Sequence, residues 1–396
     1  MGRKVSIRIV GLVLAVVGAV AVVGNGGGSS PPDFGQPFAG LTASELQRFS
    51  DGQDEFKQVE TMEEGLGPVF NDMSCANCHS SPAVGGGSTR LETRFGARLS
   101  NGTFDPLSQF GGSLIQEQGI GVAGACEYLA ETVPPQATIV AGRRTTPLFG
   151  LGLVDGIPDA LLRYIAYQQK SDPDNIAGKV SIVTNVETGL PDVGKFGWKA
   201  QNATLHVFAA DAYVNEMGVT SPMFPSENCP QGDCASLSCN PDPGVNDDGS
   251  GVQAFTDFMR FLAPPPRGPI SGSVLAGEYE FNKLGCASCH VSTMRTGPSS
   301  TAALNQVTFH PYSDFLLHDM GRLGDGITQN QATGRLMRTA PLWGVRKIET
   351  LLHDGRAKTL TEAILAHDGQ ARTARDRFAR LSSFDRARVI AFLNSL

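Results

Sequence analysis

Two copies of a Cys-x-x-Cys-His motif constrain this chain more than any other feature. They read Cys75-Ala-Asn-Cys78-His79 and Cys286-Ala-Ser-Cys289-His290. In such a motif the two thiols bond to one haem, and the adjoining histidine is placed to bind the iron. A redox dithiol does not require that histidine, and a zinc site needs a second ligand pair nearby, which neither segment has. We therefore predict two covalently bound haem c groups, with His79 and His290 as proximal iron ligands.

The first 30 residues have the pattern of a secretory signal. A basic stretch, MGRKVSIR, precedes an apolar run from Ile9 to about Gly24 and then the polar NGGGSSPP. The run is about 16 residues long, shorter than the ~20 that a membrane-spanning helix needs. We predict a signal peptide over residues 1–30, with an uncleaved membrane anchor as the alternative. The mature protein is expected to be periplasmic or otherwise exported.

The remaining cysteines and the charge add two expectations. Cys126, Cys229, Cys234 and Cys239 lie outside the two motifs, and exported thiols are usually oxidised. We predict two disulfides among them, and the sequence leaves all three pairings open. The formal net charge of −7 argues against nucleic acid as a partner.

Apolar periodicity predicts two helices around the second motif. Gly277-x-x-x-Phe281-x-x-x-Gly285 is typical of a short helix that leads into the attachment site, and Phe56 holds a similar place before the first motif. The C-terminal SSFDRARVIAFLNSL has helical spacing, with Ser382 or Ser383 as its cap. A terminal helix that crosses the entry helix would close a small haem domain.

The two halves of the chain repeat each other. Arg144-Thr-Thr-Pro147-Leu-Phe-Gly matches Arg338-Thr-Ala-Pro341-Leu-Trp-Gly. Further on, Trp198 precedes the pair Thr204-Leu205 by the same interval as His353 precedes Thr359-Leu360. The repeat indicates two tandem units.

The repeat also predicts a difference between the two irons. His367 lies fourteen residues after His353, whereas the equivalent position after Trp198 is Ala212, which cannot bind iron. We expect His367 to be the sixth ligand of the C-terminal haem and the N-terminal haem to be open. Met320 and Met337 are the alternative ligands.

These segments resemble the bacterial di-haem oxidoreductase family of peroxidase-like proteins. The family is related to di-haem cytochrome c peroxidases, to the enzyme that matures tryptophan tryptophylquinone and to the di-haem rubber oxygenases. The matching stretches include GLGPVFNDMSCANCH, RTTPLFGLGLVDGIP, FGWKAQNATL, FLLHDMG and LLHDGRAKTLTEAILAHDG, and they span residues 40–396. At the position of His367 the peroxidases have methionine and the rubber oxygenases histidine, and bis-histidine ligation gives a lower potential.

The resemblance and the residue chemistry together define a candidate site. Trp198 matches the tryptophan between the haems of the relatives. Glu216 lies four residues after Ala212 and is a candidate acid–base residue for cleaving an O–O bond, with Phe208 and Tyr213 lining the same pocket. Other side chains are expected to hold haem propionates (Arg144, Arg338) or to form hydrogen bonds near the irons (His318, His353). Calcium is a weak expectation, based on the related peroxidases and on the NDDG and DPDN segments.

We expect a mostly α fold with two tandem cytochrome c-like haem domains and long loops. Residues 36–250 would form the domain with the open, catalytic haem, and residues 251–396 the electron-transfer domain. The predicted function is reduction of hydrogen peroxide, or activation of oxygen, at the first haem. Electrons would come from a small electron-donor protein or a quinol-linked cytochrome through the second haem. The alternatives are an electron-transfer cytochrome without catalysis and a di-haem oxygenase that acts on an organic substrate.

Overall fold

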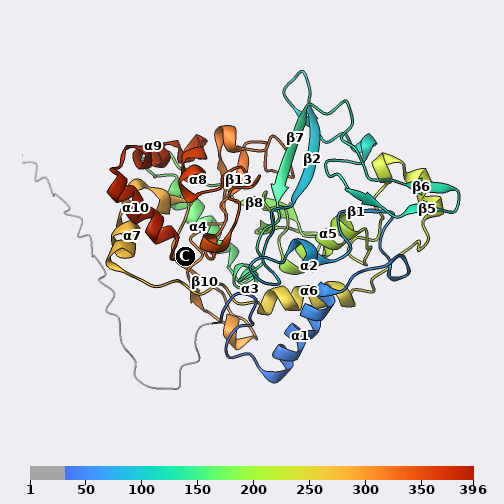
Figure 1. The fold of residues 1–396 in the computed structure, drawn as a ribbon, viewed down its shortest axis with the longest axis horizontal. Coiled ribbons are helices and arrows are strands. Elements are labelled where there is room, and N and C mark those ends of the chain that lie inside the picture. Colours follow the sequence, from blue (N-terminus) through green and yellow to red (C-terminus); the bar gives the residue numbers. More distant parts are fainter. Residues whose placement is uncertain (1–31) are drawn as a thin grey trace, which may run out of the picture. The chain divides into compact units, whose positions relative to one another are not determined.

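The computed structural model describes residues 32–396, which form helices and mostly short strands (Figure 1). The signal peptide predicted for residues 1–30 lies outside that range. The helices are α1 (Ala43–Lys57), α2 (Cys75–Cys78), α3 (Leu151–Asp155), α4 (Asp159–Gln169), α5 (Leu205–Met217), α6 (Ser250–Phe261), α7 (Gly272–Leu284), α8 (Leu360–Ala366), α9 (Arg372–Arg380) and α10 (Ser383–Leu393). The strands are β1 (Val69–Phe70), β2 (Leu91–Arg98), β3 (Phe104–Asp105), β4 (Gln118–Gly119), β5 (Gly121–Ala123), β6 (Cys126–Tyr128), β7 (Ile139–Arg144), β8 (Ser181–Thr184), β9 (Pro191–Gly194), β10 (Met294–Arg295), β11 (Thr308–Phe309), β12 (Leu317–Asp319) and β13 (Leu336–Arg338).

Two crossing helices, α7 and α10, pack beside the second motif, which follows α7. The predicted terminal helix is confirmed as α10, and Ser382 caps it by accepting a hydrogen bond from the backbone N–H of Asp385 at 3.1 Å. At the crossing, Gly277 lies so close to the carbonyl of Arg388 that no Cβ would fit. Phe281, one turn later, packs between His290 and Phe392. The entry helix therefore ends directly before the motif, beside a buried aromatic cluster.

Helices α1 and α6 repeat this arrangement around the first motif. Gly52 of α1 lies against the backbone of Ala254 in α6, again without room for a Cβ. Phe56 follows Gly52 by one turn and packs on both His79 and Phe258, which is fully buried. Full burial of one such phenylalanine contributes about 1.5–3 kcal/mol to folding.

The position of α6 bears on the predicted domain boundary. The boundary at residues 250/251 stays a prediction, but α6 begins there and packs on α1 and α5 of the N-terminal half. Packing therefore favours a division after Phe261. The larger apolar cluster also includes residues of both halves, from Phe49 to Trp343.

The prediction of a mostly α fold was wrong in this respect: helices make up 36% of the fold and strands 15%, so the fold is mixed. The largest sheet has the order β3–β2–β7, and β2 and β7 are antiparallel with Leu91 opposite Arg144 and Gly96 opposite Ile139. This pairing joins segments about fifty residues apart, which local sequence patterns do not reveal. It brings the charged ends of both strands to the first motif.

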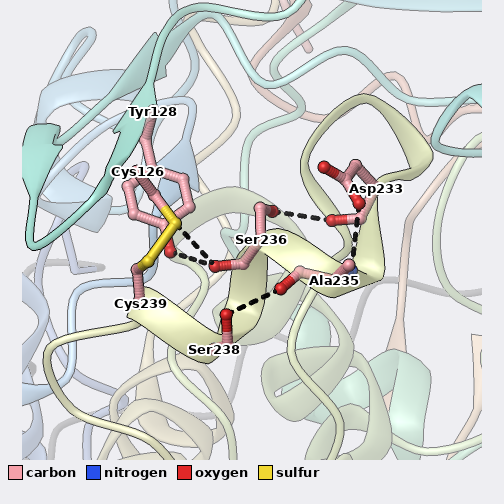
Figure 2. The surroundings of a disulfide bond; sticks show 7 residues. All are labelled: Cys126, Tyr128, Asp233, Ala235, Ser236, Ser238 and Cys239. Carbon is pink, nitrogen blue, oxygen red and sulfur yellow. Dashed lines mark hydrogen bonds between the residues drawn. A yellow bond between two sulfur atoms is a disulfide. The ribbon is translucent and has the colours of Figure 1, made fainter.

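Two disulfides are present, as predicted, and the structure gives their pairing. Cys126 of β6 bonds to Cys239, and Cys229 bonds to Cys234. Figure 2 shows the first of them, where the hydroxyl of Tyr128 donates to the carbonyl of Ser236 at 2.7 Å. The Cys126–Cys239 bond thus fastens the loop before α6 to the β5–β6 hairpin.

A membrane-spanning helix is not found within residues 32–396, since none of the helices there combines the necessary length and apolarity.

Candidate functional site

Each Cys-x-x-Cys-His motif opens onto its own cavity. The first cavity, of about 190 Å³, is lined by Cys75, Cys78 and His79. The second, of about 250 Å³, is lined by Cys286, Cys289 and His290. All four cysteines are free thiols. Each motif therefore presents two thiols and an imidazole to a single hollow, which is the donor set of a haem c site.

The imidazoles of the predicted ligands are oriented for binding iron. The Nδ1 atoms lie within hydrogen-bond distance of backbone carbonyls, at 2.9 Å for His79 to Gly86, 2.9 Å for His290 to Tyr312 and 2.7 Å for His367 to Ala363. A proton on Nδ1 leaves the lone pair of Nε2 for a metal. Burial lowers the pKa of both His79 and His290 to about 4, which keeps the rings neutral as a ligand must be.

Two buried arginines fit the propionates of a haem. Burial lowers the pKa of Arg144 and of Arg338 to about 10. The Nε atom of Arg144 is buried without a hydrogen-bond partner. The charge of Asp314 only partly offsets the effect of burial on the pKa of Arg338. A buried cation without a counter-charge is costly. Carboxylates brought by a bound group would supply the missing charges bidentately.

The second cavity contains every sixth-ligand candidate. His367 follows directly on α8 and lies on the cavity wall together with Met320 and Met337. The charge of His367 affects the pKa of His290, so the two imidazoles are near each other. The assignment of His367 stays a prediction, and its position fits that role.

The predicted hydrogen-bonding role of His318 agrees with its contacts. Its Nε2 lies 2.8 Å from a carboxylate oxygen of Asp314, and its Nδ1 lies 2.9 Å from the amide oxygen of Gln370. Among the described residues, Cys289, Asp314 and His318 are the group that could hold a metal ion. Because Cys289 belongs to the haem motif, we assign this group to the second haem site.

Asp247 lies in the NDDG segment that was considered for calcium. Its carboxylate accepts hydrogen bonds from backbone N–H groups at the start of α6.

The first cavity combines an alanine with a glutamate whose pKa is raised. Phe208, Ala212, Tyr213 and Glu216 line it from α5, as the sequence predicted for this pocket. Asn71 donates a hydrogen bond to Glu216 at 2.7 Å. Burial, and then the negative charge of Glu92, raises the pKa of Glu216 to about 8. Glu216 can therefore hold a proton near neutral pH.

Glu92 and Arg94 are site residues that sequence reasoning missed. Both lie on the cavity wall, two positions apart on β2, and they form an ion pair at 2.9 Å. Burial raises the pKa of Glu92, but the charges of Arg94 and Arg143 outweigh it and the net shift is downward. Their i, i+2 spacing in LETRF was the available signal, since alternate strand residues share a face.

Trp198 lies between the two cavities and lines both. Its indole N–H donates to the carbonyl of Arg144 at 2.9 Å. The ring meets His353, its partner in the repeat, edge to face with 6.2 Å between centroids.

The repeated segments cross-pair around this tryptophan. The backbone N–H of Arg144 donates to the carbonyl of His353 at 2.6 Å, and that of Arg338 donates to the carbonyl of Trp198 at 2.9 Å. The two halves therefore contact each other through equivalent bonds. Trp343 packs against Phe309 and over Gly150.

A buried ion network that includes Lys199, the residue after Trp198, was also missed. Asp325 lies 2.8 Å from the ammonium of Lys199 and 2.7 Å from the guanidinium of Arg143, and all three side chains are almost fully buried. Arg143 in turn lies 3.9 Å from Glu92. The network links the first cavity to the backbone that carries Trp198.

The fold and these two cavities define a protein with two haem sites, one lined by two candidate histidine ligands and one by His79 and Glu216. A family model described as "Di-haem oxidoreductase, putative peroxidase" matches residues 130–396. The chain belongs to that di-haem oxidoreductase family. The matched range contains the second motif but not the first, so the first haem site depends on the geometry described above.

Comparison with solved structures gives remote matches. Hydrazine synthase of Kuenenia stuttgartiensis is 13% identical, with 96% of this chain and 99% of that chain covered and a TM-score of 0.38. A MauG-like protein associated with microbial copper homeostasis is 13% identical (94% and 95% covered, TM-score 0.41). The di-haem peroxidase BthA of Burkholderia thailandensis is 14% identical (93% and 89% covered, TM-score 0.41). These similarities are too remote to support a conclusion about this chain. No curated protein matches the chain.

Proposed function

We propose that the protein is an exported di-haem c-type oxidoreductase that reduces hydrogen peroxide, or activates oxygen, at its first haem site. The observation that carries the proposal is the asymmetry between the cavities. His290 and His367 line the second cavity, whereas the first has His79 together with Ala212 and the proton-holding Glu216. Two histidine ligands on one iron suit electron transfer, and an open site suits a small oxidant.

When bound, the two haems supply the one-electron chemistry and the affinity for peroxide. The protein supplies proton transfer. A Glu216 carboxylate oxygen takes the proton from one peroxide oxygen and gives it to the other, which leaves as water. Asn71 holds that carboxyl group in place at 2.7 Å. Arg144 and Arg338 would hold the propionates.

Electrons are proposed to cross from the second site to the first by way of Trp198. Trp198 lines both cavities. Its segment is fixed to the opposite half by Arg338, whose backbone N–H donates to the carbonyl of Trp198 and whose Nε donates to the carbonyl of Gly197. The buried charges of Lys199, Asp325 and Arg143 lie beside it. An aromatic group held by hydrogen bonds at this position needs little reorganisation when an electron passes.

The proposed donor is a small electron-donor protein or a quinol-linked cytochrome that docks near the second site. Arg322 and Arg372 both form ion pairs with Asp368 near this site. The two arginine side chains are 89% and 60% exposed, whereas Asp368 is 5% exposed. Arg377 donates to the carbonyl of Leu284, just before the second motif. Although the chain is acidic overall, these exposed guanidinium groups favour an acidic donor.

The test of this function is reoxidation of the fully reduced protein without oxygen. We expect one equivalent of hydrogen peroxide to reoxidise both haems in a stopped-flow absorbance measurement, because peroxide takes two electrons. In Trp198→Phe the second haem should be reoxidised more slowly. Reoxidation by oxygen but not by peroxide would favour an oxygenase, and inertness to both would leave an electron carrier.

Covalent attachment of both haems is a separate prediction. The intact mass of the purified protein should exceed that of its polypeptide by two haems, since each motif offers two thiols to one group. A variant with both Cys75→Ser and Cys78→Ser should lose one covalent haem and keep the other. Extraction of haem from the unmodified protein into acid acetone would contradict the prediction.

A further inference from the structure

We propose that Tyr213 and Glu60 form a redox pair at the first haem site. The inference rests on the proposed function. Reduction of peroxide to water needs two electrons. When the second haem is already oxidised, a haem bound at the first site would supply one electron, and Tyr213 supplies the other. The phenolic proton of Tyr213 passes to the Glu60 carboxylate, which leaves a neutral tyrosyl radical and a neutral carboxylic acid.

The position of Tyr213 gives it access to the first haem. It lies on the face of α5 that lines the first cavity, together with the motif residue Cys75. The charge of Cys75 affects the pKa of Tyr213, so the phenol lies close to the thiol that would carry the haem. The side chain is buried, at 5% exposure, and its ring packs edge to face on Phe255 at 4.8 Å. A radical formed there would be shielded from solvent.

Glu60 is placed to accept the proton. The hydroxyl of Tyr213 donates to its carboxylate at 2.9 Å, within the range for direct proton transfer. Glu60 is 2% exposed, and its backbone N–H is held by the carbonyl of Met73, near the first motif. Loss of an electron makes a phenol strongly acidic, so a fixed carboxylate in contact with it makes the oxidation easier.

The resting state of the pair agrees with this role. Burial, followed by the negative charge of Glu60, raises the pKa of Tyr213, so the phenol keeps its proton until it is oxidised. Burial also raises the pKa of Glu60, which favours the protonated product.

A second tyrosine–glutamate pair provides a matched control. The hydroxyl of Tyr312 donates to Glu278 at 3.0 Å, and its carbonyl accepts from His290 at the second site. Its side chain is also buried, at 4% exposure. Tyr312 does not line the first cavity, so the same hydrogen bond is present without access to the open haem.

The experiment is to mix the fully oxidised protein with one equivalent of hydrogen peroxide, freeze it within milliseconds and record its EPR spectrum. We expect an organic radical signal that narrows when the protein is made with ring-deuterated tyrosine. Tyr213→Phe should abolish this signal, Tyr312→Phe should keep it, and Glu60→Gln should diminish it because the proton has no acceptor. The phenylalanine variant keeps the ring that packs on Phe255, and a peroxide-free spectrum checks that its haem sites are intact.

The possible failures can be told apart. If Tyr213→Phe keeps the full tyrosyl signal, or the signal does not respond to deuterated tyrosine, the redox pair is wrong while the proposed function stands. If the reduced protein is not reoxidised by peroxide at all, both proposals fail.

Discussion

Replacing Glu216 with glutamine is expected to lower kcat/KM for hydrogen peroxide by about 10²- to 10⁴-fold, the usual contribution of a positioned acid–base group. Glutamine keeps the side-chain length and the oxygen that accepts from Asn71, but it cannot carry a proton between the two peroxide oxygens. Steady-state peroxide consumption with a reduced donor is the measurement. The ferric spectra of both haems should be unchanged.

The pH profile gives this prediction a second readout. Because the pKa of Glu216 is raised to about 8, the basic carboxylate forms only as the pH rises through that value. The rate should therefore increase between about pH 7 and pH 9 in the unmodified protein, and Glu216→Gln should lose that increase. The charged groups that face Glu216 are Glu92 and Arg94 of β2, and Cys75 and Cys78 stop titrating once they carry haem.

Glu227 supplies the control. Burial raises its pKa to about 7, and it lines neither cavity. Glu227→Gln should therefore leave peroxide turnover and its pH dependence as they are. A Glu216→Gln variant with unchanged kcat/KM would remove Glu216 from the mechanism and make Glu92, another carboxyl group that lines the cavity, the next candidate.

Much of the site was predictable because its residues belong to short sequence motifs. A haem attachment sequence needs only five adjacent residues, and both motifs open onto cavities that their cysteines and histidines line. The repeat was equally informative. Thr204 and Thr359 each cap the helix that follows, α5 and α8, so the two aligned segments begin the same element.

What the sequence did not reveal depends on contacts between distant segments. Glu92 reaches the first cavity only because β2 pairs with β7, and Lys199 becomes a buried cation only because Asp325 folds against it. The strand content was missed because most strands have only two to four residues, which is too short for an alternating apolar pattern to be recognised. The boundary placed before α6 likewise treated it as the start of a domain, whereas its packing partner is α1.

Replacing His367 with alanine should convert one haem from low-spin to high-spin. The unmodified ferric protein should have one low-spin centre with two nitrogen ligands and one high-spin or weakly ligated centre, since His290 and His367 line the second cavity whereas Ala212 holds the equivalent place at the first. EPR and optical spectra of the variant should show loss of the low-spin signal, with the first haem nearly unchanged. Turnover with an external donor should fall, because the entry centre loses a ligand and its potential changes.

A His367→Met variant distinguishes ligation from packing. Methionine fills a similar volume and can bind iron, so the second haem should stay low-spin and move to a higher potential. Met320→Leu and Met337→Leu test the rival ligands on the same cavity wall, and both should keep the spectrum of the unmodified protein. If His367→Ala keeps both spectra while one of the leucine variants turns high-spin, that methionine is the ligand and the repeat alignment fails at this position. If the unmodified protein has two low-spin irons that ignore cyanide and peroxide, the first site is closed and electron transfer is the function that remains.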